Sequence, residues 1–281
     1  MLAVLAALAA LPALAAPATA WADSPQGLVP GHPGVTYLRL LRQVVPDLAA
    51  DPATGELHGH LDKALRHPAG KDYGGDPPDP IVVTGAEALS IHSGGRVRLI
   101  VLADLGQSDD RVASTTLLAL YDDSPQPRLL DAIDVGMDRD TSFSEHPRLA
   151  LGPGDDALVT YSEHSNSSQT YSSWLFLFVR GDRFQRLATL FALSSRACGW
   201  QDLEAPTFIT RADPGRPYRR LDITVSETIT NDGTTGCGDD PVPRPAHHTY
   251  RATYRWNPAR QRFETASPDL KRLDRSNRAR F

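Results

Sequence analysis

The fold is decided by residues 147–193, PRLALGPGDDALVTYSEHSNSSQTYSSWLFLFVRGDRFQRLATLFAL. Four runs rich in leucine, β-branched and aromatic residues alternate here with short segments rich in Gly, Asp, Ser and Asn. This alternation is typical of antiparallel strands joined by turns. The run WLFLFV at 174–179 is apolar at every position, as expected for a strand buried on both faces. The stretch therefore predicts a four-stranded antiparallel meander deep in a packed sheet.

The same plan occurs three times along the chain. Units of two hairpins in series begin near residues 88, 147 and 207, a spacing of about 60 residues. We therefore predict a mostly β fold of about twelve antiparallel strands in three four-stranded meander repeats, each resembling a β-propeller blade. Because propellers generally close with four or more blades, a β-sandwich built from the same hairpins is the alternative.

Residues 1–20 predict a secretory signal peptide. Their apolar, alanine-rich run ends in the small-x-small sequence ATA, which is typical of a cleavage site. Pro12 and Pro17 disfavour a stable membrane-spanning helix. We therefore expect cleavage, no stable membrane insertion afterwards, and a mature protein that is periplasmic or secreted.

The remaining chain divides into three predicted segments. Residues 21–80 form an extended and helical N-terminal segment with a linker, with an amphipathic helix over 36–45 and a second short helix around 59–66. Residues 81–266 hold the β domain of three repeats. Residues 267–281 predict a short C-terminal helix, with a frayed basic tail as the alternative.

Composition excludes several classes of protein. The formal net charge is −5 and 22% of residues are charged, so the chain has no basic excess for nucleic acid and no polybasic membrane segment. Cys198 and Cys237 are the two cysteines. In an exported protein they predict one disulfide, which would close a loop of about 40 residues and stabilise the fold by roughly 3–4 kcal/mol. Two free buried thiols are the alternative.

An antiparallel meander sorts its connections between the two ends of the sheet. The tight turns are expected at one end and the long connectors at the other, together with both cysteines. Sites gather on long connectors that a rigid sheet supports. The predicted long connectors are 105–113, 135–146, 164–172, 195–206 and 228–247.

Three carboxylates occupy equivalent positions at the strand ends that lead into these connectors: Asp104, Glu163 and Glu227. They would bind a cation or a cationic ligand if they converged, or accept hydrogen bonds from connector amides if they did not. With His164 they are the predicted ligand-binding residues. Three further candidates are Tyr171, Trp200 and Asp232.

The sequence SEH at 162–164 places a serine, a carboxylate and an imidazole in a row. Adjacent residues of a strand point to opposite faces, and the chain has no G-x-S-x-G nucleophile turn, which argues against a catalytic triad. The enzyme alternative is a secreted hydrolase that uses Glu163 with His164 or His146 as an acid–base pair.

Metal and cofactor patterns are weak throughout the chain. Asp134, Asp138 and Asp140 lack the central glycine and terminal glutamate of a calcium loop, and no H-E-x-x-H or glycine-rich phosphate motif occurs. We expect no metal and no cofactor. The favoured hypothesis is an exported, soluble β protein that binds a ligand, or an envelope or secreted protein, through the long-connector end. A purely structural interaction module is a third interpretation.

Overall fold

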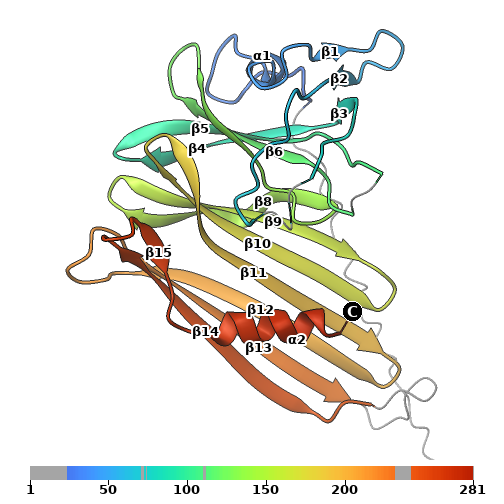
Figure 1. Cartoon of the computed structure of the whole chain (residues 1–281), viewed down its shortest axis with the longest axis vertical. Coiled ribbons are helices and arrows are strands. Elements are labelled where there is room, and N and C mark those ends of the chain that lie inside the picture. Colours follow the sequence, from blue (N-terminus) through green and yellow to red (C-terminus); the bar gives the residue numbers. More distant parts are fainter. Residues whose placement is uncertain (1–23, 71–72, 74, 110–111, 232–241, 281) are drawn as a thin grey trace, which may run out of the picture.

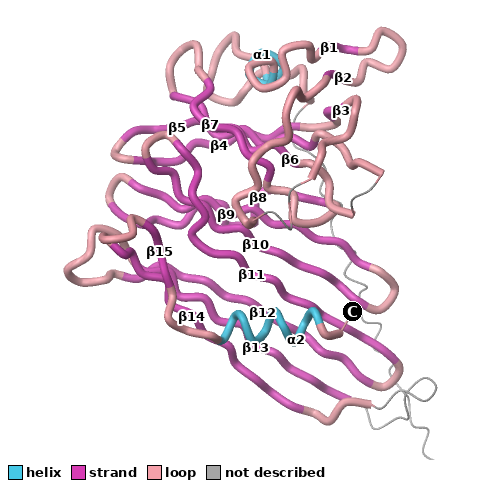
Figure 2. Tube along the Cα trace, viewed as in Figure 1, coloured by secondary structure: helices cyan, strands magenta, loops and turns pink. Residues whose placement is uncertain are grey.

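The computed structural model describes residues 24–70, 73, 75–109, 112–231 and 242–280 (Figure 1). It contains three antiparallel sheets and two short helices, so the predicted mostly β class is confirmed (Figure 2). The predicted signal peptide, Cys237 and Asp232 lie outside the described residues, so the export and disulfide predictions stay predictions. No helix within the described ranges has the length and apolar character needed to cross a bilayer.

The N-terminal part contains one helix, a small sheet and a four-stranded sheet. Helix α1 is Tyr37–Leu41. The three-stranded sheet contains β1 (Ala49–Ala50), β2 (Leu57–Gly59) and β3 (Ile81–Val83). The four-stranded sheet contains β4 (Ala86–Ser93), β5 (Arg96–Asp104), β6 (Thr116–Asp122) and β7 (Leu129–Asp134).

The C-terminal part is one eight-stranded meander followed by helix α2 (Asp269–Arg278). Its strands follow sequence order from one edge to the other. They are β8 (Asp140–Gly152), β9 (Asp155–Ser165), β10 (Gln169–Arg180), β11 (Arg183–Ala197), β12 (Trp200–Arg211), β13 (Arg220–Asn231), β14 (Ala246–Asn257) and β15 (Arg262–Glu264).

Sheets stack face to face because the central strands are apolar on both sides. One core joins α1 and the small sheet to the outer face of β4–β7, with Tyr37, Leu57 and Val101 buried in it. A second core lies between β4–β7 and β9–β11, where Leu102 meets Leu175. Burial of this kind stabilises by about 25 cal/mol per Å² of apolar surface.

A third core occupies the opposite face of β9–β11. Phe176 and Phe178 of β10 lie there with Ile223 and Val225 of β13. The alternating side chains of WLFLFV therefore enter two different cores, which confirms that this strand is buried on both faces.

The eight-stranded sheet folds back on itself between β11 and β12. These two strands pair over three residues only, from Ser195 opposite Asp202 to Ala197 opposite Trp200. Beyond that junction they separate, and the backbone N–H of Arg219 donates to the carbonyl of Leu151 (2.7 Å) across the two halves. Helix α2 contacts both β11 and β14, so it fills the space that opens between them (Figure 1).

The predicted strand runs fall within β4–β15, but their grouping into three propeller-like repeats is not confirmed. The second and third predicted units belong to one continuous sheet, and none of the three described sheets is closed. The sheets pack face to face, as in the sandwich alternative, but in more than two layers. Two predicted connectors, 164–172 and 195–206, are mostly strand joined by tight turns.

The helix predictions have mixed outcomes. The C-terminal helix is present, and Leu270 and Leu273 dock it on the third core. The N-terminal helix is shorter than the predicted 36–45. The helix predicted around 59–66 is wrong, because β2 ends there and pairs with β3. A side chain on Gly59 would lie 2.7 Å from Val45 Cγ1, so the backbone needs glycine to approach this closely.

Candidate functional site

The predicted connector end holds two polar clusters rather than one site. In the first, the ring of His164 on β9 stacks on Tyr171 of β10, with centroids 4.4 Å apart, and its Nδ1 lies 2.5 Å from Asp138 Oδ1. Glu163 accepts a hydrogen bond from the Tyr161 hydroxyl. Burial, and then this carboxylate, raise the pKa of Tyr161. Glu163 and His164 therefore use separate partners on opposite faces of β9.

The hydrolase alternative gains no support from this geometry. Within the described ranges, no hydrogen bond or ion pair joins Glu163 to His164 or to His146. His146 is exposed in β8, between Phe143 and Arg148, where the pairing with β9 is interrupted. An acid–base pair needs both groups within reach of one reacting atom.

Asp104 ends β5 at the same end of the fold. Its carboxylate accepts a hydrogen bond from the Gly106 amide (3.0 Å). Burial is the main cause that raises the pKa of Asp104, and the nearby charge of Asp140 raises it further. Asp140 in turn lies directly opposite Glu163 in the sheet. Asp140 thus acts on Asp104 electrostatically and is the cross-strand neighbour of Glu163.

Glu227 belongs to a second cluster, beneath the C-terminal end of α2. It lies directly opposite Glu204 of β12, and both side chains are buried. Arg280 places Nη2 2.6 Å from Glu204 Oε1 and 3.7 Å from Glu227 Oε1, and its Nη1 pairs with Asp202. One arginine is thus the positively charged partner of three buried carboxylates. Without such a partner, burying these charges would be strongly unfavourable.

We define the acid cluster as Asp202, Glu204 and Glu227, and burial is the main influence on the pKa of the first two. It raises the pKa of Asp202 and of Glu204, although Arg280 opposes the shift at both groups. Burial and the hydrogen bond to Glu227 raise the pKa of Tyr250 to about 12. Two groups therefore stabilise these buried acids in the folded protein. One is Arg280, and the other is the Asn277 amide, which donates a hydrogen bond to Glu204 (2.9 Å).

The remaining predicted site residues are partly placed. Trp200 is half-buried, opposite Asn231 at the start of the β13–β14 connection. Cys198 lies in the turn just before it. Among the described residues, no contact brings Asp104, Glu163 and Glu227 to one common partner. Nor does any described group of three or more His, Cys, Asp or Glu side chains have an arrangement suited to a metal ion.

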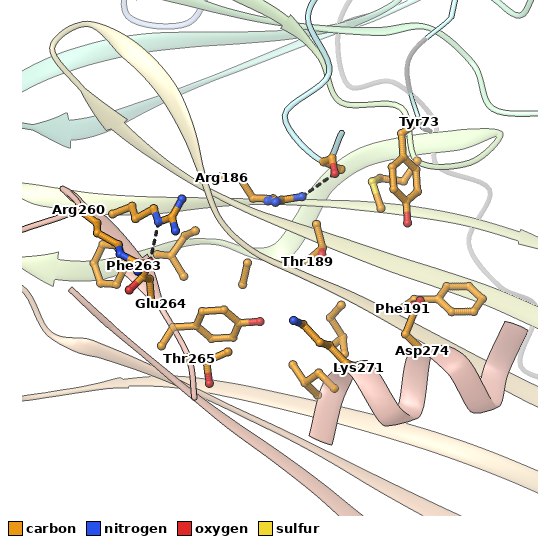
Figure 3. Close-up of a pocket in the computed structure, with 18 of the residues that line it drawn as sticks. Tyr73, Arg186, Thr189, Phe191, Arg260, Phe263, Glu264, Thr265, Lys271 and Asp274 are labelled. Carbon is orange, nitrogen blue, oxygen red and sulfur yellow. Dashed lines mark hydrogen bonds and ion pairs between the residues drawn. The ribbon is translucent and has the colours of Figure 1, made fainter. Parts of the chain in front are cut away.

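A groove that the sequence did not predict lies between β11 and α2. It is a cavity of about 790 Å³, which exists because β11 and β12 separate beyond their three-residue junction. Strand β11 forms one wall, and β15 with the first turns of α2 forms the other (Figure 3). The cavity extends to Tyr73 and to Met137, which follows β7 near the predicted connector end.

The groove is lined by more cationic than acidic groups. Arg260 and Arg262 both pair with Glu264 on β15, at 3.1 and 2.7 Å. The hydrogen bond from the Asn257 amide, followed by those from Arg262 and Arg260, lowers the pKa of Glu264 to about 2, so it remains ionised. Arg278 pairs with Asp274 on α2 (3.1 Å). Both acids of the lining are therefore already matched by arginines.

Two cations in the groove have no acidic partner among the described residues: Arg186 and Lys271. Arg186 donates to the carbonyl of Ala69 (2.5 Å), a neutral acceptor. The side chain of Lys271 extends from α2 toward the interior, opposite the wall that carries Arg186 and Thr189 (Figure 3). Unmatched cations on both sides of one cavity form a setting that favours an anion.

Comparisons with known proteins identify no relative of this chain. No protein-family model matches it, and neither the curated proteins nor the solved structures contain a significant match. The site is therefore defined by its own geometry.

Proposed function

We propose that this chain is an exported binding protein that holds an anionic, partly apolar small molecule in the groove between β11 and α2. The observation that carries the proposal is the pair of unmatched cations, Arg186 and Lys271, on opposing walls of one cavity. Binding remains the general function, as the sequence suggested, but the location moves from the connector end to the side of the sheet.

The size of the cavity supports a small-molecule ligand. Ligand pockets generally measure about 300–1,000 Å³, and the groove, at about 790 Å³, lies within that range. Two of the predicted long connectors are tight turns instead, so the connector end offers less adaptable loop surface than the sequence implied.

The chemistry of the lining supports an amphiphilic ligand. The floor of the groove is an apolar cluster formed by Leu187 and Leu190 of β11, Phe263 of β15 and Leu270 of α2. Such a floor removes hydrocarbon from water at about 25 cal/mol per Å², while a flanking cation orients the charged group. A carboxylate that carries an alkyl or aromatic portion fits both features.

The lining favours binding over catalysis. It includes no His, Cys or Ser among the described residues, so the hydroxyls of Thr189 and Thr265 have no imidazole base in the lining, and Glu264 is held ionised by two arginines and so cannot act as a general acid. A hydrolase would need a nucleophile or a base that can exchange a proton near neutral pH.

Isothermal titration calorimetry with decanoate tests the proposal, with decan-1-ol as the neutral probe of equal chain length. We expect saturable binding of decanoate, at least tenfold weaker binding of the alcohol, and a loss of at least tenfold in affinity for decanoate in Lys271→Met and in Arg186→Met. Arg272→Met is the matched control, because Arg272 is exposed on α2 and pairs with Asp269 outside the groove.

Two results would contradict the proposal. One is the absence of measurable binding by decanoate and by an aromatic carboxylate such as phenylpropionate. The other is equal loss of affinity in the Arg272→Met control, which would show that the overall charge of the protein, rather than the groove, attracts the anion.

Export is proposed separately, on the basis of residues 1–20. N-terminal sequencing of the protein expressed from the full chain in a bacterial host should give a mature protein that begins at Trp21. Recovery of the intact N-terminus from the cytoplasm would contradict it.

A further inference from the structure

The outward face of β12–β14 is a second surface with its own charge pattern. The acid cluster and the apolar side chains of β13 and β14 point inward, so alternate residues of the same strands point outward. Strand register places Arg211 directly opposite Arg220. Arg255 follows Tyr254, which pairs with Leu221, so Arg255 lies in the same cross-strand row.

Three arginines in one row of a sheet repel one another, because like charges directly opposite destabilise a strand pair. Asp222 partly compensates, at 3.3 Å from Arg211 and 3.2 Å from Arg220. Buried Asp213 pairs with Arg255 (2.6 Å). A fourth arginine, Arg251, is exposed on the same face of β14, two residues before Thr253. It has no ion pair among the described residues.

The surface is open and hydroxyl-rich. A depression of about 660 Å³ covers it, and Thr207, Thr224 and Thr253 line that depression between the arginines. Ile209 on the same face is 51% exposed. None of the outward-facing residues of β12–β14 in the described ranges is Phe, Tyr or Trp, so the face offers no stacking platform for nucleic acid bases.

Acidic and basic residues are also distributed unevenly along the sequence. Residues 1–150 contain 11 Lys or Arg and 19 Asp or Glu, whereas residues 151–281 contain 18 and 15. The protein is therefore acidic in its first half and basic in its second, although its formal net charge is −5. A local cationic face on an acidic protein attracts anionic partners to that face in preference to the rest of the surface.

We infer that this outward face binds an extended anionic polysaccharide that lies across the strands. Adjacent strands are about 4.8 Å apart, a distance on the order of the spacing between consecutive sugars in an extended polysaccharide. A carboxylated sugar in each register would meet Arg211, Arg220 and Arg255 in turn. The threonine hydroxyls would exchange hydrogen bonds with sugar hydroxyls, as both partners can donate and accept.

Affinity electrophoresis through gels that contain polygalacturonate tests this inference, with gels that contain neutral dextran as the reference. We expect retardation by polygalacturonate only, weakened at least tenfold in the double variant Arg211→Gln/Arg251→Gln and weakened by added salt. Both substitutions spare Arg255, which holds Asp213. Arg272→Gln/Arg275→Gln removes the same charge from the exposed side of α2 and should change affinity by less than twofold.

Each other outcome overturns the inference in a defined way. Absence of retardation, or equal loss in both double variants, would remove the surface as a site. Equal or tighter binding of polyphosphate or single-stranded DNA, with the same sensitivity to Arg211→Gln/Arg251→Gln, would assign it to a different polyanion. A dimer in sedimentation that this variant dissociates would assign it to a second copy of the chain.

The inference is independent of the groove. Thermal unfolding of both double variants should match that of the wild type, which keeps loss of binding distinct from loss of folding. Decanoate affinity should be unchanged in Arg211→Gln/Arg251→Gln, so either proposal can fail without the other.

Discussion

Strands β10 and β12 belong to the same sheet but bury different kinds of side chain. β10 lies between two cores, so Trp174, Phe176 and Phe178 face one and Leu175 and Leu177 face the other. β12 has one solvent-exposed face. Asp202 and Glu204 lie on its buried face, whereas Leu203 and Ile209 lie on its exposed face (47% and 51% exposed). Its alternation is the reverse of an ordinary half-buried strand.

The difference shows that the environment supplied by distant segments decides which face of a strand is buried. β10 needs only apolar neighbours, and any well-packed sheet provides them. β12 needs a cation, and the chain supplies it from its C-terminal end, where Arg280 pairs with both acids. The inner face of β12 therefore depends on the charge of Arg280, whereas β10 shares only an apolar core with α2.

The largest expected effect compares the same substitution on the two strands. Leu175→Ala should lower the free energy of unfolding by about 2–5 kcal/mol, because Leu175 is fully buried and leaves a cavity. Leu203→Ala should change it by less than about 0.5 kcal/mol, because Leu203 is largely exposed. Urea unfolding followed by circular dichroism measures both, and similar losses would mean that the outward face of β12 is covered.

The next effect tests how far β12 depends on the C-terminus. Arg280→Ala should lower the free energy of unfolding by about 2–3 kcal/mol. This is less than for a fully buried ion pair, because the Arg280 side chain is 27% exposed. Arg272→Ala, which breaks a surface ion pair on the preceding helix α2, should cost about 0–1 kcal/mol. Equal values from chemical denaturation would contradict a special role for Arg280.

The smallest effect is the pH dependence of the acid cluster. Burial raises the folded pKa of Glu204 above its unfolded value of 4.5, so the folded state binds the proton first. The resulting stability is complete below 4.5 and is lost as the pH rises through the folded pKa. The stability of the wild type relative to Glu204→Gln should therefore rise as the pH falls from neutral toward 4.5.

Urea midpoints of both proteins across that pH range measure the difference, and carboxylates elsewhere cancel because they are common to the two. A constant difference, or one that shrinks as the pH falls, would show that hydrogen bonds from Arg280, Asn277 and the Leu193 amide outweigh burial at Glu204.

Sequence patterns predicted the strands where local alternation is strong and failed where it is short or inverted. WLFLFV identified β10 because both faces are apolar over a full strand. The strands β1–β3 have two or three residues each, too few to show a period. The first half of β12 was assigned to a connector, since its buried positions hold acids that only Arg280 makes tolerable.

The candidate site was less predictable than the fold. Glu227 is a predicted ligand-binding residue, and that prediction stays a prediction. In the structure its neighbours Glu204 and Arg280 come from different segments of the chain. The groove needs Arg186 on β11 and Lys271 on α2 to line one cavity, which follows from the separation of β11 and β12. No local pattern around either residue encodes that separation.

The arginines on the outward face of β12–β14 concentrate positive charge on one side of a protein whose formal net charge is −5, which gives the folded molecule a dipole moment. Near a negatively charged surface, the torque on that dipole turns the arginine-bearing face of the sheet toward the surface before any contact forms, even though the net negative charge of the protein is repelled. Encounters with such a surface are thus oriented from a distance of about one Debye length, roughly 8 Å at physiological ionic strength.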